Sequence, residues 1–178
     1  MNECVCGHKE FESVEIHELS MARCLDCGVL RQVVDLTPEE ISQYYRDTYH
    51  QEEYTHTLLH DTKIARMRIK QYGLHAGQRV LDLGSGNGAL VMACRCRNIE
   101  AYGVELSSTS SSPHVFQQDL MDVHFPTEYF DVVMLNDVLE HFPDPRPYLE
   151  EIFRILKPNG KMVVDFPNYE REIGRAHV

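Results

Sequence analysis

Features that would identify whole classes of protein are missing from this 178-residue chain. No run of apolar residues approaches the roughly 20 that a helix needs to span a bilayer, so the sequence predicts no transmembrane segment. Residues 1–4 carry neither a basic flank nor an apolar stretch, which is not the pattern of a secretory signal. We therefore expect a cytoplasmic protein with no membrane partner.

Basic residues are scarce as well. The chain holds 28 aspartates and glutamates against 17 lysines and arginines, a formal net charge of −11 at pH 7. A surface of this sign repels nucleic-acid phosphates, so we do not expect nucleic acid as a partner. The run at residues 63–70 opposes this trend, and it fits either the solvated face of a helix or a contact for RNA.

The composition that is present, 43% hydrophobic and 25% charged residues, is that of an ordinary globular protein. The length allows one medium domain and a small appendage. We expect a small segment over residues 1–34, a helical connector over 35–75 and a main domain over 76–178. A capping box at residues 37–40 predicts the start of one connector helix. A second helix is predicted over 56–72, ending at Gly73.

From residue 79 onward, strand and helix patterns alternate. Helices are predicted near 88–97 and 146–156, and strands near 79–83, 101–105, 114–117, 129–135 and 160–166. Such alternation indicates an α/β fold with a doubly wound, mostly parallel sheet covered on both faces. The serine-rich segment 107–113 is a poor helix, and it is short for a connection between parallel strands.

A glycine-rich turn follows the first of these strands. Gly84, Gly86 and Gly88 come directly after a short apolar run that contains Asp82. Glycines at this spacing let the backbone turn sharply and let a ligand lie against bare main chain, with helix amides pointing toward it. The turn therefore predicts a nucleoside-type cofactor site. Its glycines and Glu105, about 20 residues on, also fit a nicotinamide-binding pattern.

An ordered set of motifs resembles the class I S-adenosylmethionine-dependent methyltransferases. Residues 80–88 are similar to the first motif of that family, and residues 102–107, 118–120, 130–141 and 156–161 are similar to later ones. The resemblance covers about residues 60–168 and implies a Rossmann-like fold. Strands six and seven of the family are not found, so we expect a sheet that is incomplete there.

The resemblance implies a donor site built from these motifs. Glu105 is expected to bind both ribose hydroxyls, because a carboxylate can accept two hydrogen bonds from a vicinal diol. Asp119 is expected to contact the adenine amino group, and Asn136 the amino-acid end. Each acid also has a structural interpretation: Asp82 as a turn residue, Asp119 as a cap and Glu105 as a surface residue. The full set of expected cofactor-binding residues is Asp82, Gly84, Ser85, Gly86, Gly88, Glu105, Leu106, Asp119, Leu120 and Asn136.

His141 is the candidate catalytic residue. Methyl transfer mainly requires two reactants to be held in line, and an oxygen or nitrogen acceptor can also need a base. His141 closely follows the fourth predicted strand of the main domain, and imidazole titrates near neutrality. A purely structural histidine that lines the site is the alternative interpretation.

Cysteines cluster near the amino terminus. Two close pairs in a cytosolic chain indicate a metal site more often than disulfides. Four thiolates suit tetrahedral zinc, which would give a short segment a core, so we expect a structural zinc ribbon. His8 is an alternative fourth ligand, and free thiols are the alternative to any metal. Cys94 and Cys96 are expected to be packing residues. The expected ligands are Cys4, Cys6, Cys24 and Cys27.

A cysteine ribbon followed by a connector and this domain also resembles bacterial proteins that methylate small molecules, sugars included. We therefore expect methyl transfer to a small-molecule acceptor. The alternatives are an RNA-modifying methyltransferase, a cofactor-binding protein without catalysis and an NAD-dependent oxidoreductase. Neither the acceptor nor the oligomeric state can be inferred from the sequence.

Overall fold

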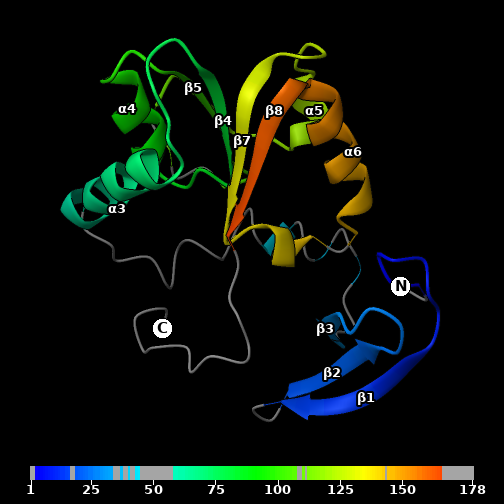
Figure 1. Cartoon of the computed structure of the whole chain (residues 1–178). Coiled ribbons are helices and arrows are strands. Elements are labelled where there is room, and N and C mark those ends of the chain that lie inside the picture. Colours follow the sequence, from blue (N-terminus) through cyan, green and yellow to red (C-terminus); the bar gives the residue numbers. More distant parts are fainter. Residues whose placement is uncertain are drawn as a thin grey trace.

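The fold was analysed in a computed structural model of the chain, which describes residues 3–16, 19–33, 37, 40, 43–44, 58–107, 110, 112–142 and 144–165. An amino-terminal unit, residues 3–33, forms a small sheet, and an α/β unit, residues 58–165, forms a larger one flanked by helices (Figure 1). No helix in the described ranges is long and apolar enough to cross a membrane.

The amino-terminal unit is an antiparallel meander of three strands. These are β1 (Phe11–Ile16), β2 (Leu19–Cys24) and β3 (Leu30–Gln32). Phe11 pairs with Cys24, and Met21 pairs with Gln32. The register places one cysteine pair at the end of β2, beside the loop that precedes β1.

The large sheet, predicted to be mostly parallel, is parallel at all of its described strand pairs. In spatial order its strands are β6 (Val115–Phe116), β5 (Glu100–Val104), β4 (Arg79–Leu83), β7 (Phe130–Asn136) and β8 (Leu156–Asp165). The chain builds outward from β4 to β6 and then returns to place β7 on the other side of β4. Ligands of open α/β sheets bind at such a reversal, beyond the carboxyl ends of the strands.

Helices cover both faces of the large sheet (Figure 1). α3 (Leu58–Gln71) and α4 (Ala89–Arg95) lie on one face, and α5 (Leu120–Val123) and α6 (Arg146–Ile155) lie on the other. A short 3-10 helix, η1 (Leu139–His141), follows β7. The predicted α/β architecture is confirmed.

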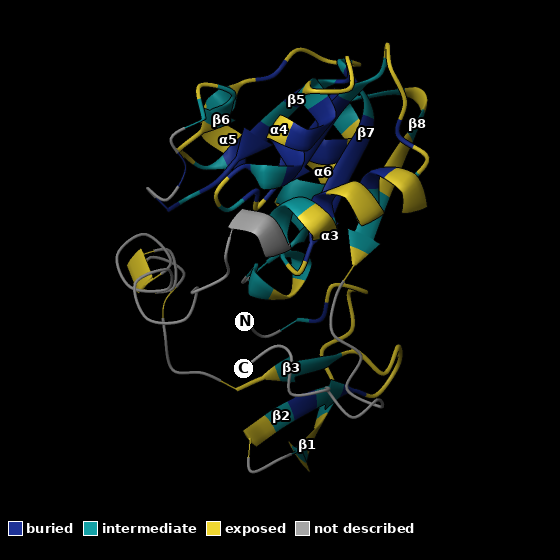
Figure 2. Ribbon diagram, turned by 90° about the vertical axis from the view of Figure 1, so that its left-hand side faces the viewer, coloured by how far each residue is buried: buried dark blue, intermediate teal, exposed yellow. Residues whose placement is uncertain are grey.

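Alternation along the central strands explains the two-sided core. Val80 and Val132 pack toward α3 and α4, whereas their neighbours Leu81 and Val133 pack toward α6. Successive side chains of a strand point to opposite faces, so continuously apolar strands bury both. Figure 2 shows the buried residues concentrated along β5 and β7, between the helices.

α3 ends where the sequence predicted. Gly73 has φ +68°, and the Leu74 amide donates back to the Ile69 carbonyl at 3.0 Å, which closes the last turn. Ala65, Ile69 and Leu74 are buried with α4 and the sheet. The helix therefore packs as part of the α/β unit, although its residues were expected in the connector.

The predicted capping box is present earlier in the chain. The Thr37 amide donates to Glu40 Oε2 at 2.7 Å, and the Glu40 amide donates to Thr37 Oγ1 at 3.2 Å. Most of residues 34–57, and residues 166–178, lie outside the described part of the structure.

The serine-rich connection is short, as the sequence indicated, yet β5 and β6 still pair in parallel. Only two residue pairs join them, Gly103 with Val115 and Val104 with Phe116. Ser110 lies buried in this connection, and its hydroxyl donates to the Asn87 carbonyl at 3.2 Å. The connection therefore packs against the glycine turn rather than forming a covering helix within its described residues.

Candidate cofactor site and cysteine cluster

The glycine turn after β4 has the backbone conformation that only glycine adopts without strain. Gly84, Gly86 and Gly88 have φ of +71°, +52° and +79°. A Cβ atom on Gly84 would collide with the Val138 side chain, whereas one on Gly86 would meet nothing within 4 Å. The main chain at Gly86 therefore faces open space, where a ligand can approach it.

Glu105, at the carboxyl end of β5, turns its side chain toward this turn. The Gly86 amide donates to Oε2 at 2.8 Å, and the amide and hydroxyl of Ser107 donate to Oε1 at 2.9 and 3.0 Å. Only 9% of Glu105 is exposed. Three donors hold the carboxylate next to the open main chain, so the interpretation of Glu105 as a surface residue is wrong.

Asp82 and Asn136 meet where the strand order reverses, between β4 and β7. Asn136 Nδ2 donates to Asp82 Oδ1 at 3.3 Å, and the Tyr72 hydroxyl donates to Asn136 Oδ1 at 2.6 Å. Burial raises the pKa of Asp82 to about 7, although the charge of Arg68 and the bond from Asn136 act in the opposite direction. A carboxyl that titrates near neutrality therefore lies at the reversal point.

Asp119 caps α5, as one of its two interpretations predicted. Its carboxylate accepts from the Met121 amide at 2.9 Å and from the Tyr148 hydroxyl at 2.7 Å. The Leu120 side chain is buried in the core, so only its main chain can face a ligand. Leu106 is partly buried beside Glu105. A contact from Asp119 to adenine stays a prediction.

The Ser85 hydroxyl is buried, so only the main chain of this residue can meet a ligand. Its side chain packs over Gly103, which has no Cβ to displace it. Ser85 Oγ is buried without a hydrogen-bond partner in the described part of the chain. A ligand lying on the turn would consequently meet the peptide groups around Ser85.

His141 ends η1, shortly after β7, and is partly buried. Burial lowers the pKa of its imidazole, while the nearby charge of Asp137 raises it less strongly. The lowered pKa favours the neutral ring, which can accept a proton.

Sequence reasoning missed the residues that hold this site together. Arg68, Tyr72, Ser107 and Tyr148 each bond to, or lie beside, an expected ligand-binding residue. Tyr72 lies 64 positions before Asn136, and Tyr148 lies 29 after Asp119. No local signal could have revealed these pairs, although Ser107 is only two residues from Glu105.

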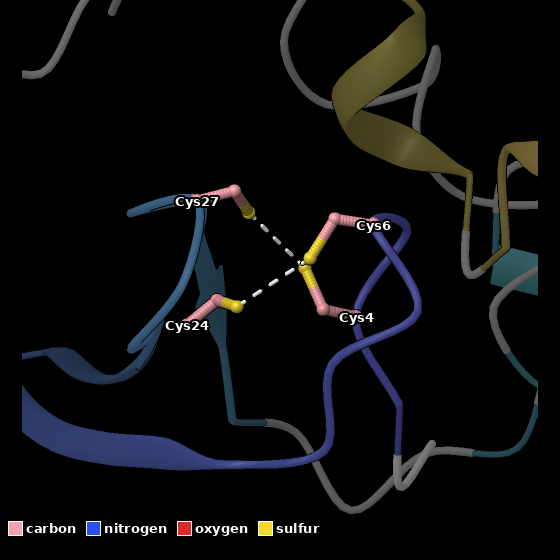
Figure 3. A group of neighbouring side chains, drawn as sticks. All are labelled: Cys4, Cys6, Cys24 and Cys27. Atoms are coloured by element: carbon pink, nitrogen blue, oxygen red, sulfur yellow. Dashed lines mark hydrogen bonds between the residues drawn. The ribbon is translucent and has the colours of Figure 1, made fainter.

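The four amino-terminal cysteines converge (Figure 3). All their Sγ atoms lie within 4.8 Å of one another, with Cys4 to Cys27 at 3.5 Å and Cys6 to Cys24 at 3.7 Å. Tetrahedral zinc with Zn–S bonds of about 2.3 Å requires S–S separations of about 3.8 Å. The donor set thus fits such an ion, and the tight Cys4–Cys6 pair could supply both of its sulfurs.

His8 does not replace a cysteine in that group. Its Nδ1 lies 3.3 Å from Asp26 Oδ2, and with Cys6 these two residues form a second, exposed group. Cys94 is buried in the core, as expected of a packing residue, whereas Cys96 is exposed, so the expectation that it packs is wrong. Neither belongs to either group.

Comparison with known proteins agrees with the fold. A family model described as "Methyltransferase domain" matches residues 50–177. A ubiquinone biosynthesis O-methyltransferase of Psychrobacter arcticus is 34% identical over 108 residues, covering 52% of this chain and 42% of the relative. A ubiquinone/menaquinone biosynthesis C-methyltransferase of Vibrio vulnificus is 30% identical over 116 residues, covering 56% and 45%.

Among solved structures, a SAM-dependent methyltransferase from Archaeoglobus fulgidus superimposes with a TM-score of 0.52. The two chains are 25% identical, and the match covers 60% of this chain and 53% of that chain. The chain thus spans about half the length of the relatives it matches. Because the family match covers well over half of the residues, the chain belongs to the class I S-adenosylmethionine-dependent methyltransferases.

Proposed function

We propose that the chain binds S-adenosylmethionine at the carboxyl ends of β4, β5 and β7 and transfers its methyl group to a small-molecule acceptor. The observation that carries this proposal is the Glu105 carboxylate, which lies 2.8 Å from the Gly86 amide beside open main chain. A ribose bound there would donate hydrogen bonds from its two hydroxyls to the Glu105 carboxylate. The adenosyl group would then lie across the glycine turn.

The remaining candidate residues divide between the two ends of the donor. Asp119 and the Leu120 main chain would face the adenine. Asn136 and Asp82 would face the amino-acid end, where a buried carboxylate and an amide suit an ammonium and a carboxylate. The donor when bound supplies an activated methyl group. The chain's own groups bind and orient it, and His141 would take the proton from an acceptor hydroxyl.

We propose a phenolic or quinol-type ring as the acceptor. The support is that the two named relatives act in ubiquinone and menaquinone biosynthesis, one as an O-methyltransferase and one as a C-methyltransferase. A half-buried neutral histidine is a suitable base for a hydroxyl of this kind.

Calorimetry with S-adenosylhomocysteine and, separately, NAD tests the donor site. The wild-type chain is expected to bind the first and not the second. Glu105→Gln should weaken binding by about tenfold or more, because it removes charge-assisted hydrogen bonds. Glu100→Gln is the matched control, since Glu100 lies at the opposite end of the same strand. Binding of NAD, or equal binding by both variants, would contradict the proposal.

We also propose that residues 1–34 form a zinc-ribbon-like domain with one structural zinc held by Cys4, Cys6, Cys24 and Cys27. The connector 35–75, whose helix α3 packs on the α/β unit, and the methyltransferase domain 76–178 would follow it. The geometric support is the mutual approach of the four sulfurs. Elemental analysis of the purified chain should give one zinc per chain, and Cys27→Ser should lower that ratio while Cys96→Ser leaves it unchanged.

A further inference from the structure

Tyr72 reaches into the donor site from outside every motif that defines it. It directly follows α3, and its hydroxyl donates to Asn136 Oδ1 at 2.6 Å. On the other side of the amide, Asn136 Nδ2 donates to Asp82 Oδ1 at 3.3 Å. The three side chains form a line from α3 through the end of β7 to β4.

This line fixes the orientation of the Asn136 amide. An asparagine amide can turn over and exchange its acceptor with its donors. With Oδ1 taken by the Tyr72 hydroxyl, the NH₂ group must face Asp82, and one N–H remains for a ligand. The reversed amide would set Oδ1 against a carboxylate, which is repulsive whenever Asp82 is charged.

α3 itself is tied to the site at both ends, so Tyr72 is held in place. Near the start of the helix, Asp61 Oδ2 accepts from Asn87 Nδ2 of the glycine turn at 2.7 Å. One turn before Tyr72, Arg68 pairs with Asp137 at 3.5 Å, next to Asn136. A hydroxyl directly after so constrained a helix can set the amide without a large entropic cost.

We propose that Tyr72 is a positioning residue for the amino-acid end of the methyl donor, acting through Asn136. Its hydroxyl orients the amide so that the site offers one N–H from Asn136 and one carboxylate from Asp82 to that end. The adenosyl end, held by Glu105 and the glycine turn, does not depend on Tyr72. This inference rests on the proposed function, because it assigns a role at the proposed donor site.

The test compares two ligands that differ only at the amino-acid end. S-adenosylhomocysteine has that end, and 5′-methylthioadenosine lacks it. Tyr72→Phe removes the hydroxyl and keeps the ring, so it should lower the affinity for S-adenosylhomocysteine about five- to tenfold. The affinity for 5′-methylthioadenosine should stay at the wild-type value. In an Asn136→Ala background, Tyr72→Phe should have no further effect.

Tyr102→Phe is the matched control. Its hydroxyl also donates to a side-chain oxygen, Glu100 Oε1 at 2.8 Å, but at the opposite end of the sheet. It should change neither affinity. If the wild-type chain binds both ligands, the inference is overturned when Tyr72→Phe lowers the affinity for both equally, or for neither. Failure of the wild-type chain to bind either ligand would instead overturn the proposed function.

Discussion

The raised pKa of Asp82, at the proposed donor site, should make the free energy of unfolding depend on pH, and Asp82→Asn should remove that dependence. The carboxyl is buried, and its pKa rises from 3.8 to about 7 because burial disfavours the charged form. Asparagine has nearly the same shape and keeps an oxygen that can accept from Asn136 Nδ2. The variant therefore removes the titration while keeping the hydrogen bond.

The sign and size of the effect follow from proton binding. Between pH 4 and 7 the folded chain keeps the Asp82 proton and the unfolded chain loses it, so rising pH destabilises the fold. From pH 5 to pH 8 this titration lowers the free energy of unfolding by about 2.5 kcal/mol, at about 1.4 kcal/mol per pKa unit. The free energy of unfolding of Asp82→Asn, relative to that of the wild type, should thus be about 2.5 kcal/mol higher at pH 8 than at pH 5.

Urea unfolding of both proteins at pH 5 and pH 8 measures this difference, and other titrating groups cancel in the comparison. Asp131→Asn is the control. Burial opposes its ionisation, but the Arg79 amide and the Lys157 ammonium bond to the carboxylate and lower its pKa. It stays charged from pH 5 to 8, so Asp131→Asn should destabilise equally at both. If the free energies of unfolding of the wild type and Asp82→Asn also differ by the same amount at both pH values, the reasoning is refuted.

Three further predictions concern the turn, the base and the metal. Gly86→Ala should lower the free energy of unfolding by about 1–2 kcal/mol because residue 86 has a left-handed backbone. Gly84→Ala should lower it by about 1–3 kcal/mol more because the added Cβ meets Val138. Equal urea midpoints for the two variants would contradict this. His141→Ala should lower turnover at saturating donor, and unchanged turnover would rule out its role as a base. In the wild type, the rate should persist at pH values below the usual histidine pKa, because burial lowers the pKa of His141. Zinc removal by a chelator should expose residues 3–33 to proteolysis and leave S-adenosylhomocysteine affinity intact, whereas unchanged proteolysis would argue against a structural metal.

Local patterns in the sequence were sufficient for most elements of the α/β unit, though not for α5, η1 or the start of β8. The strand before the glycine turn lies where the apolar run predicted it, and α3 stops at Gly73. The capping box at Thr37 and Glu40 closes as expected. These features depend on backbone preferences and on bonds within a few residues, which a sequence displays directly.

The last strand shows where local patterns stop. The sequence predicted a strand near residues 160–166. The structure starts β8 at Leu156, and its register shifts between the Phe130–Leu156 and Val132–Lys161 pairs. Asn159, with φ +64°, lies inside this irregularity. The pairing of Leu156 with Phe130 moves the start of the strand ahead of this irregularity, and no pattern within the segment could indicate it.

The sequence by itself determined the strand–helix alternation, the glycine turn and the residue types of the candidate site, because each is a short-range property of the chain. Tertiary structure alone decided the strand order, the line from Tyr72 through Asn136 to Asp82, and the Tyr148 bond to Asp119. It also brought four sulfurs within 4.8 Å. These contacts join residues far apart in the chain, and packing of the helices and strands, rather than any local preference, brings them together.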